Sequence, residues 1–204
     1  LLTGDYAYVP LGSTANKHGR VIGTNLAGGN DRFPGIIGTS IVKVFDYTVG
    51  RAGLTVKEAD SRKLATMNVV VPATDRPHYY PGVKPVIIKL VADVTNRKVL
   101  GAQVIGTGQA DKRIDVLATA IGLGADVDQL ANLDLAYAPP YSEALDNVIT
   151  AANVLRNLLD GITSKVSPQD VKQRLDSGED FVLLDVRSPQ EFEAMRIDDP
   201  RVRP

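Results

Sequence analysis

The chain has 204 residues, of which 44% are hydrophobic and 23% are charged, as in an ordinary globular protein that can bury a core. Its net charge of −1 gives no electrostatic reason to expect a nucleic acid or an anionic membrane as partner. The absence of cysteine excludes disulfides and a cysteine nucleophile from these residues, and two distant histidines are a poor basis for a metal site, so we expect none.

The first forty residues predict one helix after a broken segment. Pro10-Leu11-Gly12 forms a turn, Ser13 or Thr14 caps the helix, and Gly28-Gly29-Asn30 ends it after about Ala27. Asp5 offers a free carboxylate just before this helix, which suits a sugar hydroxyl or a polar ring edge of a cofactor. The alternative is a surface aspartate with a routine cap, and the residues alone favour that alternative.

The next segment predicts strands, because β-branched residues alternate along it. Thr95-Asn96-Arg97 is expected to be a hairpin turn between two strands rich in Val and Ile, which should be central in the sheet. Thr55 is expected to cap a short helix, with Glu58 completing a capping box. The predicted strands cover residues 39–46, 47–54, 66–73, 85–93 and 99–105.

Two loops are unusually rich in proline and tyrosine. Residues 74–83 contain Tyr79 and Tyr80, and residues 133–146 contain Tyr137 and Tyr141 on either side of Pro139-Pro140. Prolines stiffen a loop, so these loops are suited to presenting hydroxyl groups to a ligand. The alternative is that the tyrosines are half-buried packing residues.

Helices are predicted after these strands and around the second loop. The spacing of apolar residues predicts them over residues 111–123, 127–132 and 143–159, the last capped by Ser142. The elements up to residue 161 therefore predict an α+β fold, with a mainly antiparallel sheet and its helices on one face. Gly106-Thr107-Gly108 follows a strand but lacks the rest of a dinucleotide-binding fingerprint.

The last residues predict the beginning of another domain. After a linker at residues 162–166, Ser167-Pro168 starts a helix, residues 181–185 form a buried strand, and Ser188 with Glu191 opens a further helix. The missing initial Met and the abrupt end at Pro204 lead us to expect an internal piece of a longer polypeptide.

Several stretches of this chain resemble one family. They are residues 10–20, 38–46, 100–106, 111–121 and 135–142. Together they resemble the flavin-dependent pyridine nucleotide–disulfide oxidoreductases, in the branch of coenzyme A–disulfide reductases and NADH oxidases. Residues 182–193 (Val-Leu-Leu-Asp-Val-Arg-Ser-Pro-Gln-Glu-Phe-Glu) are similar to the start of an α/β rhodanese domain, although Ala194-Met195 stand where that domain usually has glycine and histidine.

The resemblance implies a layout and a set of partners. Residues 1–30 would be the tail of an FAD-binding domain, residues 31–161 a dimerisation domain, and residues 162–204 a linker and the truncated start of a rhodanese-like domain. The full-length enzyme would be a cytoplasmic homodimer that uses NAD(P)H and FAD to reduce coenzyme A disulfide, a persulfide or a polysulfide. None of the redox groups would lie in these residues, so the fragment alone would be inactive.

The resemblance also implies roles for particular residues. Tyr79 and Tyr137 would act catalytically in the partner subunit's active site, because a phenol is neutral at pH 7 and can donate a hydrogen bond to a thiolate. Tyr80 and Tyr141 would bind the substrate. The contacts to FAD would come from Asp5 and from a set near the helix start, namely Leu11, Thr14 and Ala15.

Two other functions stay open at this point. One is an NADH oxidase or peroxidase of the same fold, which would act on oxygen species and need no coenzyme A groove. The other is a dimerisation or sulfur-carrier module without catalysis, which the missing Met and the interrupted rhodanese pattern argue against.

Overall fold

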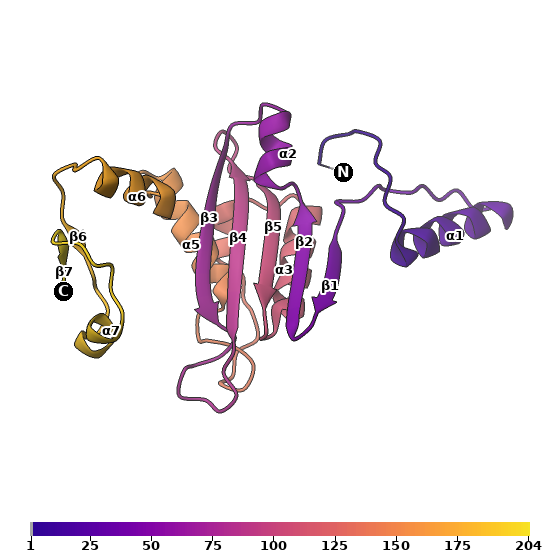
Figure 1. The fold of residues 1–204 in the computed structure, drawn as a ribbon. Helices are drawn as coiled ribbons and strands as arrows, with labels where there is room; N and C mark the ends of the chain where they lie inside the picture. The colour runs from indigo at the N-terminus through magenta and orange to yellow at the C-terminus, as the bar shows by residue number, and fades with distance from the viewer. Residues whose placement is uncertain (1) are drawn as a thin grey trace. The chain divides into compact units, whose positions relative to one another are not determined.

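A computed structural model describes residues 2–204 of the chain. The chain forms two compact units, of which the first ends at Thr163 and the second runs from Ser164 to Pro204. The first unit is built on one five-stranded sheet, in the order β1-β2-β5-β4-β3, in which every neighbouring pair is antiparallel (Figure 1). The strands are β1 (Ser40–Val44), β2 (Tyr47–Gly53), β3 (Thr66–Thr74), β4 (Pro85–Asp93) and β5 (Val99–Gly106).

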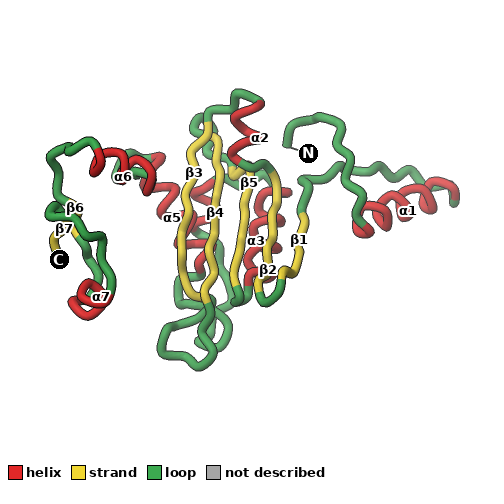
Figure 2. Tube along the Cα trace, in the orientation of Figure 1, coloured by secondary structure: helices red, strands yellow, loops and turns green. Residues whose placement is uncertain are grey.

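The helices that pack on this sheet cover one of its faces. Helix α3 (Ala110–Gly122) packs on β2 and β5, and α5 (Asn147–Leu159) packs on β3 and β4, with the short α4 (Val127–Ala131) against α5 (Figures 1 and 2). Buried side chains from the strands meet buried side chains from the helices and form the core, including Ile88, Leu90, Val104, Ile114, Leu117 and Leu155. Burial of one such side chain contributes roughly 1.5–3 kcal/mol. The predicted α+β class and one-sided helices are therefore confirmed.

The central hairpin and the short capped helix are also confirmed. β4 and β5 lie inside the sheet, and the Asp93 carboxylate accepts the N–H groups of Thr95 (2.7 Å) and Asn96 (3.1 Å) in the turn between them. Helix α2 (Val56–Ser61) begins with the capping box of Thr55 and Glu58. These features depend on residues close in the sequence, which is why the local pattern predicts them.

Two predicted helix starts are wrong. Helix α1 (Gly12–Leu26) starts after Leu11 and has no capping side chain, and none of its residues is buried. Helix α5 begins at Asn147 because Asp146, not Ser142, caps it by accepting the Val148 N–H at 3.0 Å. The Ser142 hydroxyl instead donates to Asp146 Oδ2 at 3.0 Å, so residues 143–146 belong to the loop.

The second unit is small. It contains α6 (Pro168–Asp176), β6 (Leu183–Leu184), α7 (Pro189–Ala194) and β7 (Val202–Arg203), with β6 and β7 paired in parallel. Helix α7 begins with the predicted capping box of Ser188 and Glu191, and α6 begins at the predicted Ser167-Pro168, where Ser167 and Asp170 form a capping box that was not predicted. The predicted buried strand over residues 181–185 is wrong: two residues pair, and Val182 and Leu184 are exposed. About forty residues bury little by themselves, and Val202 is the one buried side chain among those described in this unit.

Candidate functional site

The two tyrosine-bearing loops lie at the same end of the sheet. We call residues 75–84, between β3 and β4, tyrosine loop 1, and residues 132–146, between α4 and α5, tyrosine loop 2 (Figure 1). Two hydrogen bonds fasten one to the other where they leave the regular elements. The Asn147 side-chain amide donates to the carbonyl of Thr74 at 2.7 Å, and the Thr74 hydroxyl donates to Glu143 at 3.0 Å. Segments about seventy residues apart in the sequence thus form one surface.

None of the four predicted tyrosines is buried. Tyr79 is 68% exposed, Tyr137 48% and Tyr141 62%, while Tyr80 is partly covered. Backbone hydrogen bonds shape the turns that carry two of them, from Tyr80 N–H to the carbonyl of Pro77 and from Tyr141 N–H to the carbonyl of Ala138, each 2.9 Å. The phenols are therefore presented outward on ordered turns and do not fill the core of their own subunit.

A buried aspartate closes tyrosine loop 1. The Asp75 backbone N–H donates to the Lys84 carbonyl at 2.8 Å, and the Lys84 N–H donates back to Asp75 Oδ1 at 2.9 Å. Arg76 adds an ion pair to Asp75 Oδ2 at 3.1 Å. Burial alone would raise the pKa of the Asp75 carboxyl, but the hydrogen bonds from Arg76 and Lys84 lower it further than burial raises it. Asp75 thus acts as a charged clasp between the two ends of the loop.

The structure also shows a buried arginine behind both loops. Arg113 on α3 is 0% exposed, and its guanidinium lies against Asp75 of tyrosine loop 1 and Asp146 of tyrosine loop 2. The sequence pattern predicts this helix correctly, but the role of Arg113 was not predicted. Its signal was present: Arg113 stands four residues before Leu117, on the apolar stripe of the helix, where a charged residue requires a buried partner.

The predicted FAD-contacting residues gather around a second place in the first unit. Asp5, Leu11, Thr14 and Ala15 all line one hollow of about 820 Å³, beside His18 and Phe33, whose rings meet edge-to-face at 4.2 Å. The first turn of α1 has no capping side chain and no acidic residue, so its backbone N–H groups are available to an acceptor from outside the helix. The exposed Asp5 carboxylate also forms a long ion pair with Arg62, at 3.4 Å. This set of donors and one carboxylate fits a flavin, which offers ring acceptors and sugar-like hydroxyls.

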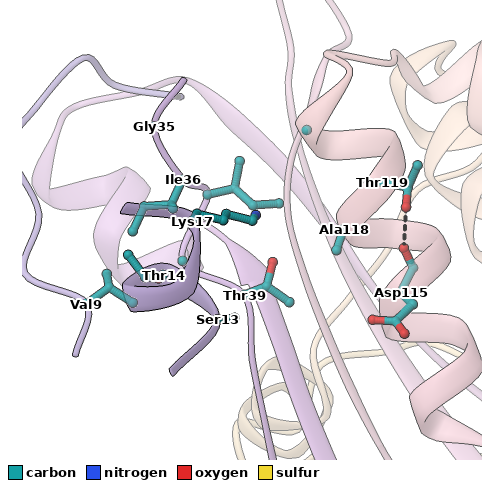
Figure 3. A pocket seen from close by; sticks show the side chains of 13 residues that line it. Val9, Ser13, Thr14, Lys17, Gly35, Ile36, Thr39, Asp115, Ala118 and Thr119 are labelled. Atoms are coloured by element: carbon teal, nitrogen blue, oxygen red, sulfur yellow. Dashed lines mark hydrogen bonds between the residues drawn. The ribbon is translucent and has the colours of Figure 1, made fainter. Parts of the chain in front are cut away.

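A neighbouring hollow of about 480 Å³ lies between α1 and α3. Lys17 and Thr14 line it from the α1 side, and Asp115 and Thr119 from the α3 side, with Thr39 between them (Figure 3). The Thr119 hydroxyl donates a hydrogen bond to the backbone carbonyl of Asp115 at 2.8 Å. The sequence analysis did not predict this hollow. Within residues 2–204, no three acidic or histidine side chains gather so that they could hold a metal ion.

Residues 39–149 match the family model "Pyridine nucleotide-disulphide oxidoreductase, dimerisation domain", which covers more than half of the chain and includes both tyrosine loops. The chain belongs to the pyridine nucleotide-disulphide oxidoreductase family. It is 38% identical over 156 residues to an NAD(P)H sulfur oxidoreductase (CoA-dependent) of Pyrococcus furiosus, covering 76% of this chain and 35% of that protein. It is 38% identical over 141 residues to a coenzyme A disulfide reductase of Staphylococcus aureus, covering 69% and 32%.

Solved structures of the family share the same architecture. A NAD-dependent persulfide reductase from A. fulgidus is 47% identical, with a TM-score of 0.89 over 100% of this chain and 36% of that one. The chain thus spans about a third of the length of the relatives that it matches. Among the described residues, no helix combines the length and apolar character needed to cross a bilayer.

Proposed function

We propose that this chain is the dimerisation part of an NAD(P)H- and FAD-dependent disulfide reductase that acts as a homodimer on coenzyme A disulfide, a persulfide or a polysulfide. Two findings support the substrate class. The Staphylococcus aureus relative is named for coenzyme A disulfide, and the A. fulgidus relative for persulfide. The proposal includes a cytoplasmic location, as the resemblance implies.

The observation that carries the proposal is the pair of tyrosine loops fastened together at one end of the sheet, with their phenols exposed. Exposure leaves the phenolic hydroxyls free to reach a neighbouring subunit, which is what a surface that completes a neighbouring active site requires. In the proposed dimer, Tyr79 and Tyr137 donate hydrogen bonds to a thiolate or leaving thiol held by the partner subunit. Tyr80 and Tyr141 contact the substrate beside them.

The contribution of these phenols is electrostatic. When a disulfide is reduced, one sulfur departs as a thiolate, and negative charge accumulates on it. A phenolic O–H aimed at that sulfur stabilises the charge without competing as a nucleophile. When bound, FAD would supply the redox chemistry, because it can take two electrons from NAD(P)H and make them available for disulfide reduction. In this chain, Asp5 would accept a hydroxyl of the flavin side chain, and the α1 start at Leu11, Thr14 and Ala15 would face the ring edge.

The proposed domain layout follows the resemblance. Residues 1–30 end an FAD-binding domain, residues 31–161 form the dimerisation domain, and residues 162–204 hold the linker and the start of a rhodanese-like domain. The support for the last part is the segment at residues 182–193, the helix that Ser188 caps, and the A. fulgidus structure, which covers the whole chain.

Phenylalanine variants of the full-length enzyme test the site. We expect Tyr137→Phe and Tyr79→Phe each to lower turnover of coenzyme A disulfide about 10- to 100-fold, because each loses one hydrogen bond to a charged group. Tyr47→Phe is a matched control, since Tyr47 on β2 is 49% exposed and lies outside both loops. Unchanged turnover in both loop variants would remove these phenols from the mechanism, and oxygen consumption in place of disulfide reduction would favour the oxidase alternative.

A further inference from the structure

Arg113 is a buried cation whose contacts reach both tyrosine loops. Its Nη2 donates to the carbonyl oxygen of Asp75 at 2.9 Å and lies 3.1 Å from Asp146 Oδ2. Its Nη1 donates to the carbonyl and the side-chain oxygen of Gln109, at 3.2 and 3.3 Å. The Nε atom is buried as well and has no hydrogen-bond partner. One planar group therefore joins three segments of the chain.

Two of these contacts are made to residues that fix the geometry of the loops. Asp75 is the clasp of tyrosine loop 1, because it pairs with Lys84 at the far end of that loop. Asp146 is the last residue of tyrosine loop 2, where it caps α5 and accepts the Ser142 hydroxyl. A change in the position of Arg113 would therefore move both loops at once.

The third segment, just after β5, is packed equally closely. A Cβ atom added at Gly108 would lie 2.7 Å from the Asp75 Cβ, closer than real side chains approach. The glycine pair that the sequence analysis set aside as an incomplete nucleotide motif thus has a packing role at Gly108. It lets the turn before α3 approach tyrosine loop 1, so that Arg113 on the next helical turn can reach Asp75.

Stability gives a weak reason to keep this arrangement. Taking a guanidinium and a carboxylate out of water costs about as much as their attraction returns, so apolar side chains of similar volume often serve as well. The orphaned Nε shows that the hydrogen-bonding capacity of Arg113 is not fully used. What an apolar side chain would not supply is a rigid fork with several donors pointing in fixed directions.

We propose that Arg113 is a positioning residue that holds the two tyrosine loops as one unit, so that Tyr79 and Tyr137 are presented to the partner subunit in a fixed relation. This inference rests on the proposed function for its catalytic consequence, but the holding of the loops can be measured by itself. A lysine at this position would keep the charge and lose the fork, so Arg113→Lys should loosen the loops as well.

The test uses the full-length holoenzyme with Arg113→Lys and with the double variant Arg113→Met/Asp146→Asn, which keeps a capping side chain for α5. The double variant leaves no buried charge without a partner, because the other cation paired with Asp146, Lys112 at 3.6 Å, has a side chain that is 32% exposed to water. We expect amide hydrogen exchange to become at least tenfold faster at the hydrogen-bonded amides of the two loops, namely Tyr80, Lys84, Tyr141 and Ser142. Turnover of coenzyme A disulfide should fall at least tenfold, while the rate at which NAD(P)H reduces the flavin stays unchanged. A residue with a merely structural role would not separate these two rates.

Arg97→Met is the matched control. Arg97 also contacts two carboxylates, those of Asp128 and Asp160, but at the hairpin turn between β4 and β5. Its loss should leave exchange in the tyrosine loops and disulfide turnover unchanged. If Arg113→Lys does not fold, the same two measurements on the double variant test the proposal. Asp146→Asn alone tests the contact between Arg113 and Asp146 independently.

The outcomes separate the two proposals. Unchanged loop exchange in a folded Arg113 variant would overturn the positioning role, whatever the turnover. Faster loop exchange with full disulfide turnover would confine Arg113 to structure and overturn its catalytic consequence. If Tyr79→Phe and Tyr137→Phe keep full turnover, the proposed function fails, while the exchange measurement still decides whether Arg113 holds the loops.

Discussion

The two ends of the sheet are each tied together by an arginine, but in opposite ways. At the end with the hairpin turn, Arg97 is 28% exposed and grips two surface carboxylates, with distances of 2.8 Å to Asp128 and 2.7 Å to Asp160. At the end with the tyrosine loops, Arg113 is fully buried and binds two backbone oxygens, the side-chain oxygen of Gln109 and one buried carboxylate, Asp146. The first arrangement joins regular elements at the surface, whereas the second holds irregular loops from behind.

The two arginines differ in what they contribute to the fold. Hydrogen bonds to Asp128 and Asp160 raise the pKa of Arg97, as expected for a cation held between carboxylates at a well-screened surface. A surface pair of this kind contributes little to stability, because water competes for both partners. A buried cation is tolerated where a counter-charge and hydrogen bonds compensate for the loss of its hydration. The stability of the tyrosine-loop end therefore depends on a few buried polar residues, whereas no single polar contact is essential to the stability of the hairpin-turn end.

The largest expected effect is the loss of a carboxylate at the buried end. Asp146→Ala would leave Arg113 without its counter-charge and remove the cap of α5, so we expect a loss of about 3–5 kcal/mol in the free energy of unfolding. Asp128→Ala at the hairpin-turn end should cost about 1 kcal/mol or less. Urea unfolding of the two variants and the parent chain measures both. Equal losses of unfolding free energy would show that the buried and the exposed ion pair contribute equally to stability, which would contradict the difference described above.

The same contrast explains what the sequence could and could not predict. The strands, the hairpin turn and the Thr55–Glu58 capping box depend on neighbours within a few residues, and the structure confirms them. The start of α5 was mispredicted because Ser142 and Asp146 are both good capping residues. Asp146 also forms an ion pair with Arg113, which is 33 positions away, and a local pattern cannot show such a contact.

The candidate site was likewise predicted only where it depends on local sequence. The two tyrosine loops stood out by composition, and the structure joins them, but the contacts that fasten them run between segments about seventy residues apart. The strand predicted over residues 181–185 failed for a related reason. An apolar run predicts burial only where the rest of a core is present, and the second unit buries almost nothing.

A smaller effect is expected from glycines at the two ends. Gly108→Ala would push its Cβ into Asp75, so we expect a loss of about 1–3 kcal/mol together with lower disulfide turnover. Gly124, near the hairpin-turn end, has a φ of +72°, and a Cβ added there would make only an ordinary contact, at 3.8 Å from Lys98 Nζ. Gly124→Ala should therefore cost about 1–2 kcal/mol through backbone strain alone and leave turnover unchanged. Thermal unfolding and a turnover assay on both variants check this, and equal turnover in the two would argue against a tight approach at Gly108.

The smallest effect concerns pH and tests Asp75 as the clasp of tyrosine loop 1. Burial would raise the pKa of Asp75, but its hydrogen bonds with Arg76 and Lys84 hold the pKa of the folded state below the ordinary value of 3.8. A group with a depressed folded pKa contributes stability that is fully present above its unfolded value and is lost as the pH falls through the folded one. The native protein should thus lose this contribution only below about pH 3.8.

Asp75→Asn removes that titration, so its unfolding free energy should fall less steeply with acid than that of the parent chain, from a lower starting value at pH 7. Arg97 stays charged throughout this range, as a guanidinium does in proteins, and its hydrogen bonds to Asp128 and Asp160 raise its pKa further. The cation at the hairpin-turn end therefore does not titrate in the same window. Urea unfolding between pH 7 and pH 3 provides both slopes. If they coincide, the carboxylate of Asp75 does not clasp tyrosine loop 1 in its charged form, and the loop must be closed by the backbone pair with Lys84 alone.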